Sequence, residues 1–156
     1  MSAVVITVLG VLVAKLMHDD FRSHALAGAE LQARSLAAAT AEANMTTDDV
    51  DRGLSFATAQ PLDNAFDHTA DGFQRVKVWA PDGHIVYSDD AQLAGATYNV
   101  TGGVTAALQG TLTSSVADPS LPQYARERGH GELLAVYVPL TLGRQAPAAV
   151  FELDRP

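Results

Sequence analysis

A β-hairpin signal in the middle of the chain constrains the fold most. Val76 and Val78 alternate with polar or aromatic residues, Pro81-Asp82-Gly83 follows, and a second apolar run then begins. Proline fixes φ on entry to such a turn, and glycine adopts φ > 0 without steric cost. The pattern therefore predicts two antiparallel strands over 74–80 and 84–88, joined by a tight turn.

Helical patterns precede the hairpin. Residues 18–45 contain no proline and are rich in alanine, the best helix former, so one long helix is expected there. Thr46 with Asp49 forms a capping signal for a second helix over 46–59, and apolar spacing over 62–73 marks a third helical face. One narrow side of the long helix is rich in small residues, which suits packing against a second protomer's helix or against the domain's own sheet: Met17, Phe21, Gly28, Leu31 and Ser35.

The remainder of the chain alternates short helices and strands. We expect a turn with a short helix over 92–98, a helix over 103–109 and a polar loop over 118–131. The fold class predicted is α+β with a mainly antiparallel sheet. Its five strands are expected over 74–80, 84–88, 111–117, 132–142 and 146–153.

An apolar segment opens the chain. From Ser2 to Met17 it spans 16 residues, which as a helix is roughly 24 Å against a hydrocarbon core of about 30 Å. We interpret residues 1–17 as a transmembrane anchor. Because the segment is shorter than the hydrocarbon core, a truncated anchor is included in this interpretation. A buried core helix and a signal peptide cleaved near Ala25-Leu26-Ala27 are the alternatives.

Composition excludes several functions. The net charge is −8 with only 10 Lys and Arg and no basic run, so nucleic-acid binding is not expected. The absence of cysteine excludes disulfides, thiolate zinc sites and a cysteine nucleophile. The sequence also lacks HExxH, G-x-S-x-G and phosphate-loop motifs. We therefore expect no catalytic residue, metal site or cofactor in this segment.

Six segments in a fixed order resemble the single Cache, or PDC, sensor domain of bacterial membrane receptors. They are 76–83 (VKVWAPDG), 86–89 (VYSD), 93–95 (LAG), 106–110 (AALQG), 133–140 (LLAVYVPL) and 150–153 (VFEL). The resemblance implies a PAS-like, PDC sensor core over 74–156. On this resemblance, residues 18–73 are expected to form a long N-terminal helix with short helices, and residues 1–17 the anchor.

That resemblance implies a function at the cell membrane, with the domain on the extracytoplasmic side. It would be the ligand-sensing input of a sensor histidine kinase or diguanylate cyclase whose output module is absent from this chain. A homodimer through the N-terminal helix is expected. A sensor regulated by a partner protein or a divalent cation, and a secreted protein that is not a sensor, are the alternatives.

In this family the ligand lies between the sheet and the segments that cover it. Members that bind citrate or C4-dicarboxylates carry basic residues at the end of the second strand, where this chain has Ser88-Asp89-Asp90. A small neutral or cationic ligand is therefore expected. Core packing of the aromatic residues and solvent exposure of the arginines are the alternatives for the candidate ligand-binding residues, which are Trp79, Tyr87, Tyr98, Tyr124, Arg126, Arg128, His130 and Tyr137.

Overall fold

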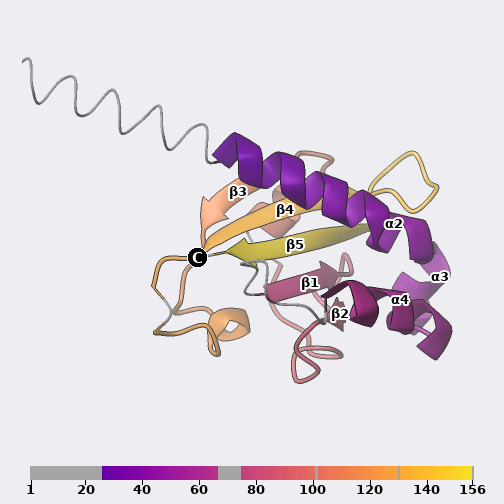
Figure 1. Ribbon diagram of the computed structural model, residues 1–156, viewed down its shortest axis with the longest axis horizontal. Helices are drawn as coiled ribbons and strands as arrows, with labels where there is room; N and C mark the ends of the chain where they lie inside the picture. Colours follow the sequence, from indigo (N-terminus) through magenta and orange to yellow (C-terminus); the bar gives the residue numbers. More distant parts are fainter. Residues whose placement is uncertain (1–25, 67–74, 101, 130, 156) are drawn as a thin grey trace, which may run out of the picture.

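A five-stranded antiparallel sheet organises the part of the chain that the computed structural model describes, residues 26–66, 75–100, 102–129 and 131–155. The strand order is β2-β1-β5-β4-β3, and each neighbouring pair is antiparallel (Figure 1). The α+β class and the antiparallel sheet predicted from the sequence are confirmed. The strands are β1 (Arg75–Trp79), β2 (Ile85–Ser88), β3 (Thr113–Val116), β4 (Leu134–Leu140) and β5 (Ala149–Arg155).

The β1–β2 turn forms as expected. The N–H of Gly83 donates to Ala80 O over 3.1 Å, and Gly83 has φ +87°. A Cβ at this position would lie 2.0 Å from the carbonyl oxygen of Tyr98, so both the backbone angle and the available space require glycine. The turn therefore fixes the register of the hairpin and holds residue 98 against it.

The first observed helix agrees with the helix predicted from the sequence, and the helices between it and the sheet differ from the prediction. Residues 26–39 are helical, and α2 (Ala41–Asn44) follows after a turn at Thr40. The expected single helix over 46–59 is wrong: α3 (Thr47–Arg52) ends at Gly53, whose φ of +88° stops it, and α4 (Phe56–Phe66) begins afterwards.

Two local features explain that difference. The Thr46 N–H donates to Asp49 Oδ2 over 2.8 Å, which confirms the capping signal at the start of α3. Ser55 Oγ accepts from the Thr58 N–H over 3.2 Å and so caps the start of α4. Pro61 then lies inside α4, where it removes one backbone donor without ending the helix.

Two short elements complete the fold. Residues 91–95 form turns rather than a short helix, and Thr97 forms an isolated bridge with His84. The helix expected over 103–109 is present as α5 (Gly103–Leu108), and a 3-10 turn, η2 (Pro122–Tyr124), lies within the long polar loop.

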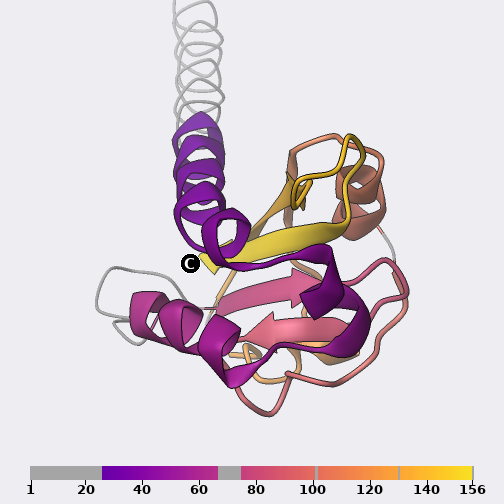
Figure 2. The same cartoon turned by 90° about the vertical axis from the view of Figure 1, so that its right-hand side faces the viewer.

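The helical segment 26–39 and α2 pack beside β4 and β5 (Figures 1 and 2). A row of buried alanines faces the sheet, and their small side chains let the helix approach it closely: Ala29, Ala33, Ala37 and Ala41. The narrow side predicted for helix packing points elsewhere, since Gly28, Leu31 and Ser35 are exposed. Met17 and Phe21 lie outside the described residues.

The sheet therefore has two covered faces. The helix-covered face carries Val76, Val78, Phe151 and Leu153 beneath the N-terminal helices. The opposite face, here called the cavity face, carries Trp79, Tyr137 and Val150 beneath α5 and the loop 117–133. Alternate residues of each strand point to opposite faces, so Lys77, between Val76 and Val78, and Glu152, between Phe151 and Leu153, lie on the cavity face.

The proposed membrane anchor, residues 1–17, lies outside the described residues. Among the helices that the structure describes, none has the length and apolarity needed to cross a bilayer.

Candidate functional site

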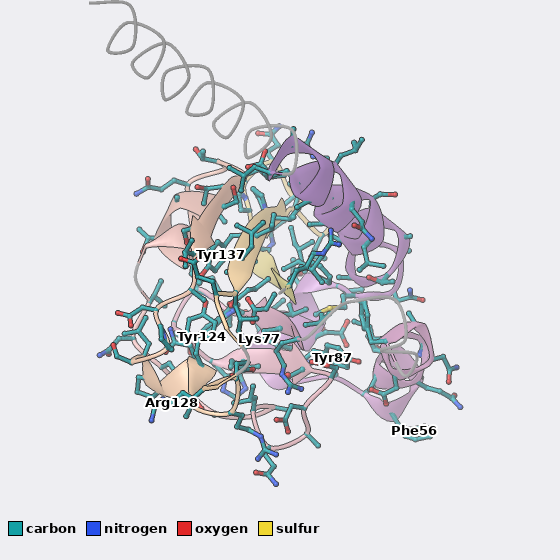
Figure 3. All side chains as sticks on the ribbon, turned by 60° about the vertical axis from the view of Figure 1, so that its left-hand side comes forward. Phe56, Lys77, Tyr87, Tyr124, Arg128 and Tyr137 are labelled. Carbon is teal, nitrogen blue, oxygen red and sulfur yellow. The ribbon has the colours of Figure 1, made fainter. Side chains whose placement is uncertain are left out.

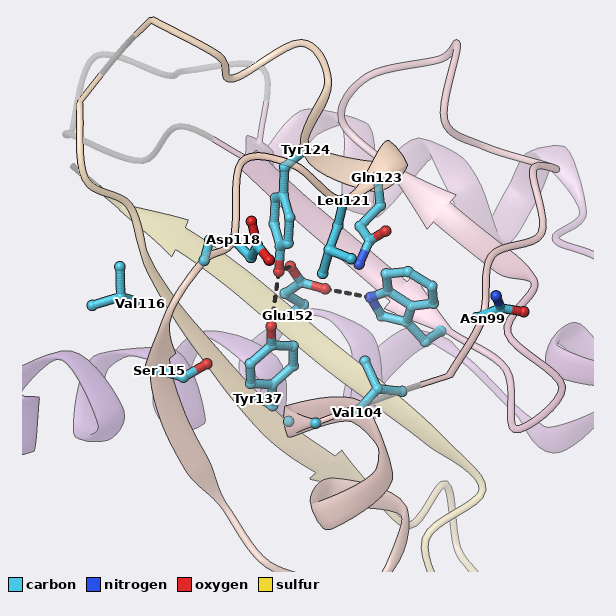
Figure 4. A pocket seen from close by; sticks show the side chains of 14 residues that line it. Asn99, Val104, Ser115, Val116, Asp118, Leu121, Gln123, Tyr124, Tyr137 and Glu152 are labelled. Atoms are coloured by element: carbon cyan, nitrogen blue, oxygen red, sulfur yellow. Dashed lines mark hydrogen bonds between the residues drawn. The ribbon is translucent and has the colours of Figure 1, made fainter.

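A cavity of about 180 Å³ opens on the cavity face of the sheet (Figure 4). Trp79 of β1, Tyr137 of β4 and Glu152 of β5 line its sheet side. Val104 of α5 and Tyr124 of η2 line it from the covering segments. We call it the Glu152 cavity, after the carboxylate on its floor.

Strand register brings these side chains together. Glu152 pairs with Lys77 on one side and with Tyr137 on the other, so all three lie side by side on the cavity face. Trp79 is two residues beyond Lys77 on the same face. The covering loop is closed at its base by a hydrogen bond from the Ala117 N–H to Leu133 O over 2.8 Å.

Glu152 is the centre of a buried hydrogen-bond network. Its Oε1 accepts from Lys77 Nζ over 3.1 Å and from the Tyr124 hydroxyl over 2.7 Å. Its Oε2 accepts from the indole N–H of Trp79 over 2.5 Å. Three donors thus compensate the desolvation of this carboxylate, which would otherwise be prohibitive.

A second carboxylate adjoins the first. Lys77 Nζ donates to Asp154 Oδ2 over 2.5 Å, and Lys77, Glu152 and Asp154 are each 0% exposed. Among the described residues, Asp154 Oδ1 has no hydrogen-bond partner, although it is buried. Burial and the neighbouring charge of Glu152 raise the pKa of Asp154 well above its usual range, and the Lys77 ammonium only partly offsets this.

Glu152 and Asp154 also change the pKa of Lys77. Burial lowers the pKa of Lys77, but the attraction of Glu152 and Asp154 outweighs burial, so the pKa is raised and the ammonium stays charged. The ammonium also lies over the Tyr124 ring, 4.5 Å from the centroid. One positive charge therefore faces two carboxyl groups.

Tyr124 and Tyr137 remain protonated. Their hydroxyl oxygens are 2.8 Å apart, and both pKa values are raised by burial and by the charge of Glu152. Because the Tyr124 proton is donated to Glu152, Tyr137 supplies the proton between the two hydroxyls. The chain of donors therefore runs from Tyr137 through Tyr124 to Glu152.

A separate ion-pair network lies beside this one. Arg75 Nε donates to Glu127 Oε1 over 3.0 Å, and its guanidinium lies 3.3 Å from Asp89 Oδ2 and 3.7 Å from Asp90 Oδ2. Arg126 Nε lies 2.7 Å from the same Asp90 oxygen. Asp89 and Asp90 are therefore occupied by arginines and do not line the Glu152 cavity, so they do not themselves set the charge preference for a ligand there.

The structure brings three of the eight predicted site residues to the Glu152 cavity: Trp79, Tyr124 and Tyr137. The Tyr98 ring packs edge-on against the Trp79 ring, with the two ring centroids 6.2 Å apart. Tyr98 also lines a shallower neighbouring hollow. Ligand contact by these residues stays a prediction.

The remaining four residues lie elsewhere. Tyr87 is on the helix-covered face, where its hydroxyl donates to Asp63 over 3.2 Å, so it does not line the Glu152 cavity, and its contact with a ligand stays a prediction (Figure 3). Arg126 is exposed, binds Asp90 and donates to Gln92. Arg128 is exposed and donates to the carbonyl of Pro119. His130 lies outside the described residues.

Sequence reasoning missed the buried charges. Lys77, Glu152 and Asp154 each alternate with buried apolar residues, a pattern that usually marks a strand face open to water. Here the second face is covered as well, so these side chains are enclosed. The signal available was a charged residue in each of two strands that pair directly, Lys77 with Glu152.

The described residues contain no group of three or more side chains placed to hold a metal ion. No family model matches the sequence, and none of the curated proteins compared with it is a detectable relative.

Proposed function

We propose that this chain is the extracytoplasmic ligand-sensing input domain of a membrane-bound bacterial signalling protein, and that its ligand binds in the Glu152 cavity. The observation that carries the proposal is a cavity with aromatic walls, beneath which three donors hold a buried carboxylate. Ligand pockets are typically apolar and aromatic with a few fixed polar groups. The resemblance to single Cache sensors supplies the membrane setting and the signalling role.

The cavity suits a small ligand. A volume of about 180 Å³ exceeds the roughly 150 Å³ that holds one benzene molecule, so about six to eight non-hydrogen atoms fit. None of the described residues that line it is basic, whereas Glu152 and Asp118 are acidic. A neutral or cationic ligand is favoured over a dicarboxylate on this lining.

One strand links the cavity to the N-terminal helix. Glu152 is on β5, and three residues later Arg155 donates to Gln32 of the helical segment over 2.8 Å. On the neighbouring edge, Ser114 of β3 donates to Glu30 over 2.8 Å. A shift of the sheet on ligand binding is thereby transmitted to the helix that leads toward the proposed anchor.

The energetics set a condition on such a sensor. A micromolar ligand binds with about 8 kcal/mol, while an almost complete switch requires about 5.5 kcal/mol of difference between the two states. Most of the binding energy must therefore be specific to one state. Contacts from both the sheet and the covering loop provide that, because the loop can close on the ligand.

The exposed side of the N-terminal helix serves in the proposed homodimer. Leu31 is 71% exposed there, between Gly28 and Ser35, and small neighbours let a second helix approach. Sedimentation of the chain at increasing concentration should show a dimer that Leu31→Glu weakens. An unchanged dimer in this variant would exclude this side of the helix.

A thermal-shift screen of the chain against small metabolites tests the ligand-sensing role. Ser115 is an exposed residue that lines the cavity, so Ser115→Phe fills space there, while Ala57→Phe adds bulk on the exposed side of α4, away from the cavity. A compound that stabilises the native chain and Ala57→Phe, but not Ser115→Phe, supports the proposal. If every stabilising compound acts equally on Ser115→Phe, the cavity is not a ligand site.

The extracytoplasmic location has its own test. The chain has no cysteine, and Phe56 is 82% exposed, so Phe56→Cys gives one reactive thiol. A membrane-impermeant maleimide should label this variant in intact cells. Leu62→Cys, at a position that is 0% exposed, is the control and should react only after unfolding. Labelling of Phe56→Cys only in lysed cells would contradict the proposed location.

A further inference from the structure

We propose that the ligand of the Glu152 cavity is a small primary ammonium compound, held by hydrogen-bond acceptors whose direction the surrounding network fixes. This inference rests on the proposed function, because it assigns the chemistry of the same cavity. The observations that carry it are the direction of the donor chain, the charges around the cavity and the aromatic walls.

The direction of the hydrogen bonds leaves acceptors toward the cavity. Tyr137 donates to Tyr124, and Tyr124 donates to Glu152 Oε1, so neither hydroxyl has a proton left to offer. Glu152 itself is 0% exposed, so it acts by fixing the direction of this chain rather than by touching the ligand. A ligand that donates is therefore matched, whereas a ligand acceptor would face the lone pairs of these oxygens.

The charges around the cavity also favour a cationic ligand. Beneath the cavity, the Lys77 ammonium is balanced by Glu152, because the raised pKa of Asp154 favours its protonated form. At the rim, Asp118 accepts from the Ser120 N–H over 2.9 Å, and hydrogen bonding to Ser120 lowers the pKa of Asp118, so it is ionised. A ligand cation is attracted by this negative charge, whereas an anion is repelled by it.

The protein already shows this mode of recognition once. The Lys77 ammonium is held by carboxylate oxygens and lies over the ring of Tyr124 on one side of the network. Trp79 and Tyr137 offer aromatic rings on the cavity side, and Trp is the strongest cation–π partner. A ligand ammonium would use the Tyr137 hydroxyl oxygen and these rings as Lys77 uses Glu152 and Tyr124.

Binding of matched probes to the intact chain, measured by isothermal titration calorimetry, tests the assignment. The probes are isobutylammonium, isobutanol and isobutyrate, which share a branched carbon skeleton, and tetramethylammonium, a cation without N–H donors. We expect isobutylammonium to bind most tightly and isobutyrate to show no binding at millimolar concentration. Equal or tighter binding of tetramethylammonium would overturn the role of donated hydrogen bonds.

Two pairs of variants locate the binding. Tyr137→Phe removes an acceptor of the cavity and should weaken isobutylammonium binding about threefold to tenfold, whereas Tyr87→Phe, on the helix-covered face, should leave it unchanged. Asp118→Asn should also weaken binding and reduce its salt dependence. Its control is Asp82→Asn, an exposed residue in a similar turn that accepts from the His84 N–H.

The outcomes separate this inference from the proposed function. Tighter binding of isobutanol or isobutyrate, lost in Ser115→Phe, would overturn the ammonium assignment and leave a ligand-binding cavity. Failure of all four probes would overturn the ammonium assignment as well. The metabolite screen with Ser115→Phe judges the cavity independently of these probes.

Discussion

The ring of Tyr137 lies against the α-carbon of Gly103, so closely that a Cβ on Gly103 would be 2.2 Å from Tyr137 Cδ2. Any side chain at this position must displace the ring. The first residue of α5 therefore sets the position of a cavity aromatic on β4, and with it the hydrogen bond to Tyr124.

Replacing this glycine tests that relationship. We expect Gly103→Ala to cost about 1–3 kcal/mol in the free energy of unfolding, because overpacking forces the ring or α5 to move. It should also abolish ligand-induced thermal shifts. Gly28→Ala is the control: its Cβ would meet nothing within 4 Å, and alanine favours the helix by up to about 1 kcal/mol. Urea denaturation of both variants measures the difference, and equal stability of the two would contradict the contact.

The buried ammonium should be essential to stability. Lys77→Met leaves Glu152 and Asp154 buried without their cation, and we expect a loss of about 3–5 kcal/mol in the free energy of unfolding. Arg52→Met removes an exposed ion pair with Asp48, at 3.7 Å, and should cost less than about 1 kcal/mol. A Lys77→Met chain as stable as Arg52→Met would show that the cluster is not enclosed.

Stability should also depend on pH through Asp154. The folded state raises its pKa above the unfolded value of about 3.9. Between these two values the unfolded carboxyl is ionised while the folded one keeps its proton, so this group lowers stability as pH rises from about 4 toward the folded pKa.

The Asp154→Asn variant cannot ionise at this position. Its free energy of unfolding should therefore increase relative to the native chain as pH rises through that window. Denaturant titrations at a series of pH values measure the difference between the two chains. A difference that stays constant with pH would mean that Asp154 titrates normally in the folded state.

The covering loop should become ordered on binding. Tyr124 and Glu127 bond to the sheet side, yet Glu127 Oε2 is buried without a hydrogen-bond partner among the described residues, so the polar contacts of the loop are incomplete. We expect a ligand from the screen to increase amide protection over residues 124–130. Hydrogen exchange with and without the ligand measures this protection. Protection that changes only in the core strands would contradict the proposal that the covering loop closes on a ligand held by the sheet.

Much of the fold could be predicted because local patterns determine it. The Pro81-Asp82-Gly83 turn defined the hairpin, and alternating apolar residues located the strands. The helix boundary after Arg52 was missed because the stop at Gly53 and the tolerance of Pro61 inside α4 depend on the surrounding packing.

The site was predicted less well, for a physical reason. The aromatic pattern suggested Trp79, Tyr124 and Tyr137, which do line the cavity. The face of the sheet on which a strand residue lies depends on the strand register, and Tyr87 lies on the opposite face. Glu152 and Asp154 appeared as ordinary polar positions, because only a covering loop distant in sequence turns a solvent face into a cavity. Strand pairing between Lys77 and Glu152 was the relationship that sequence alone did not reveal.

The fluorescence of Trp79 tests the central claim most directly. It is the only tryptophan of the chain, it lines the Glu152 cavity, and its indole N–H bonds to Glu152. Titration with isobutylammonium should change its emission in a saturable way in the native chain and in Ala57→Phe, and leave Ser115→Phe unchanged. An unchanged emission on saturating binding, or an equal change in Ser115→Phe, would contradict a ligand seated in this cavity.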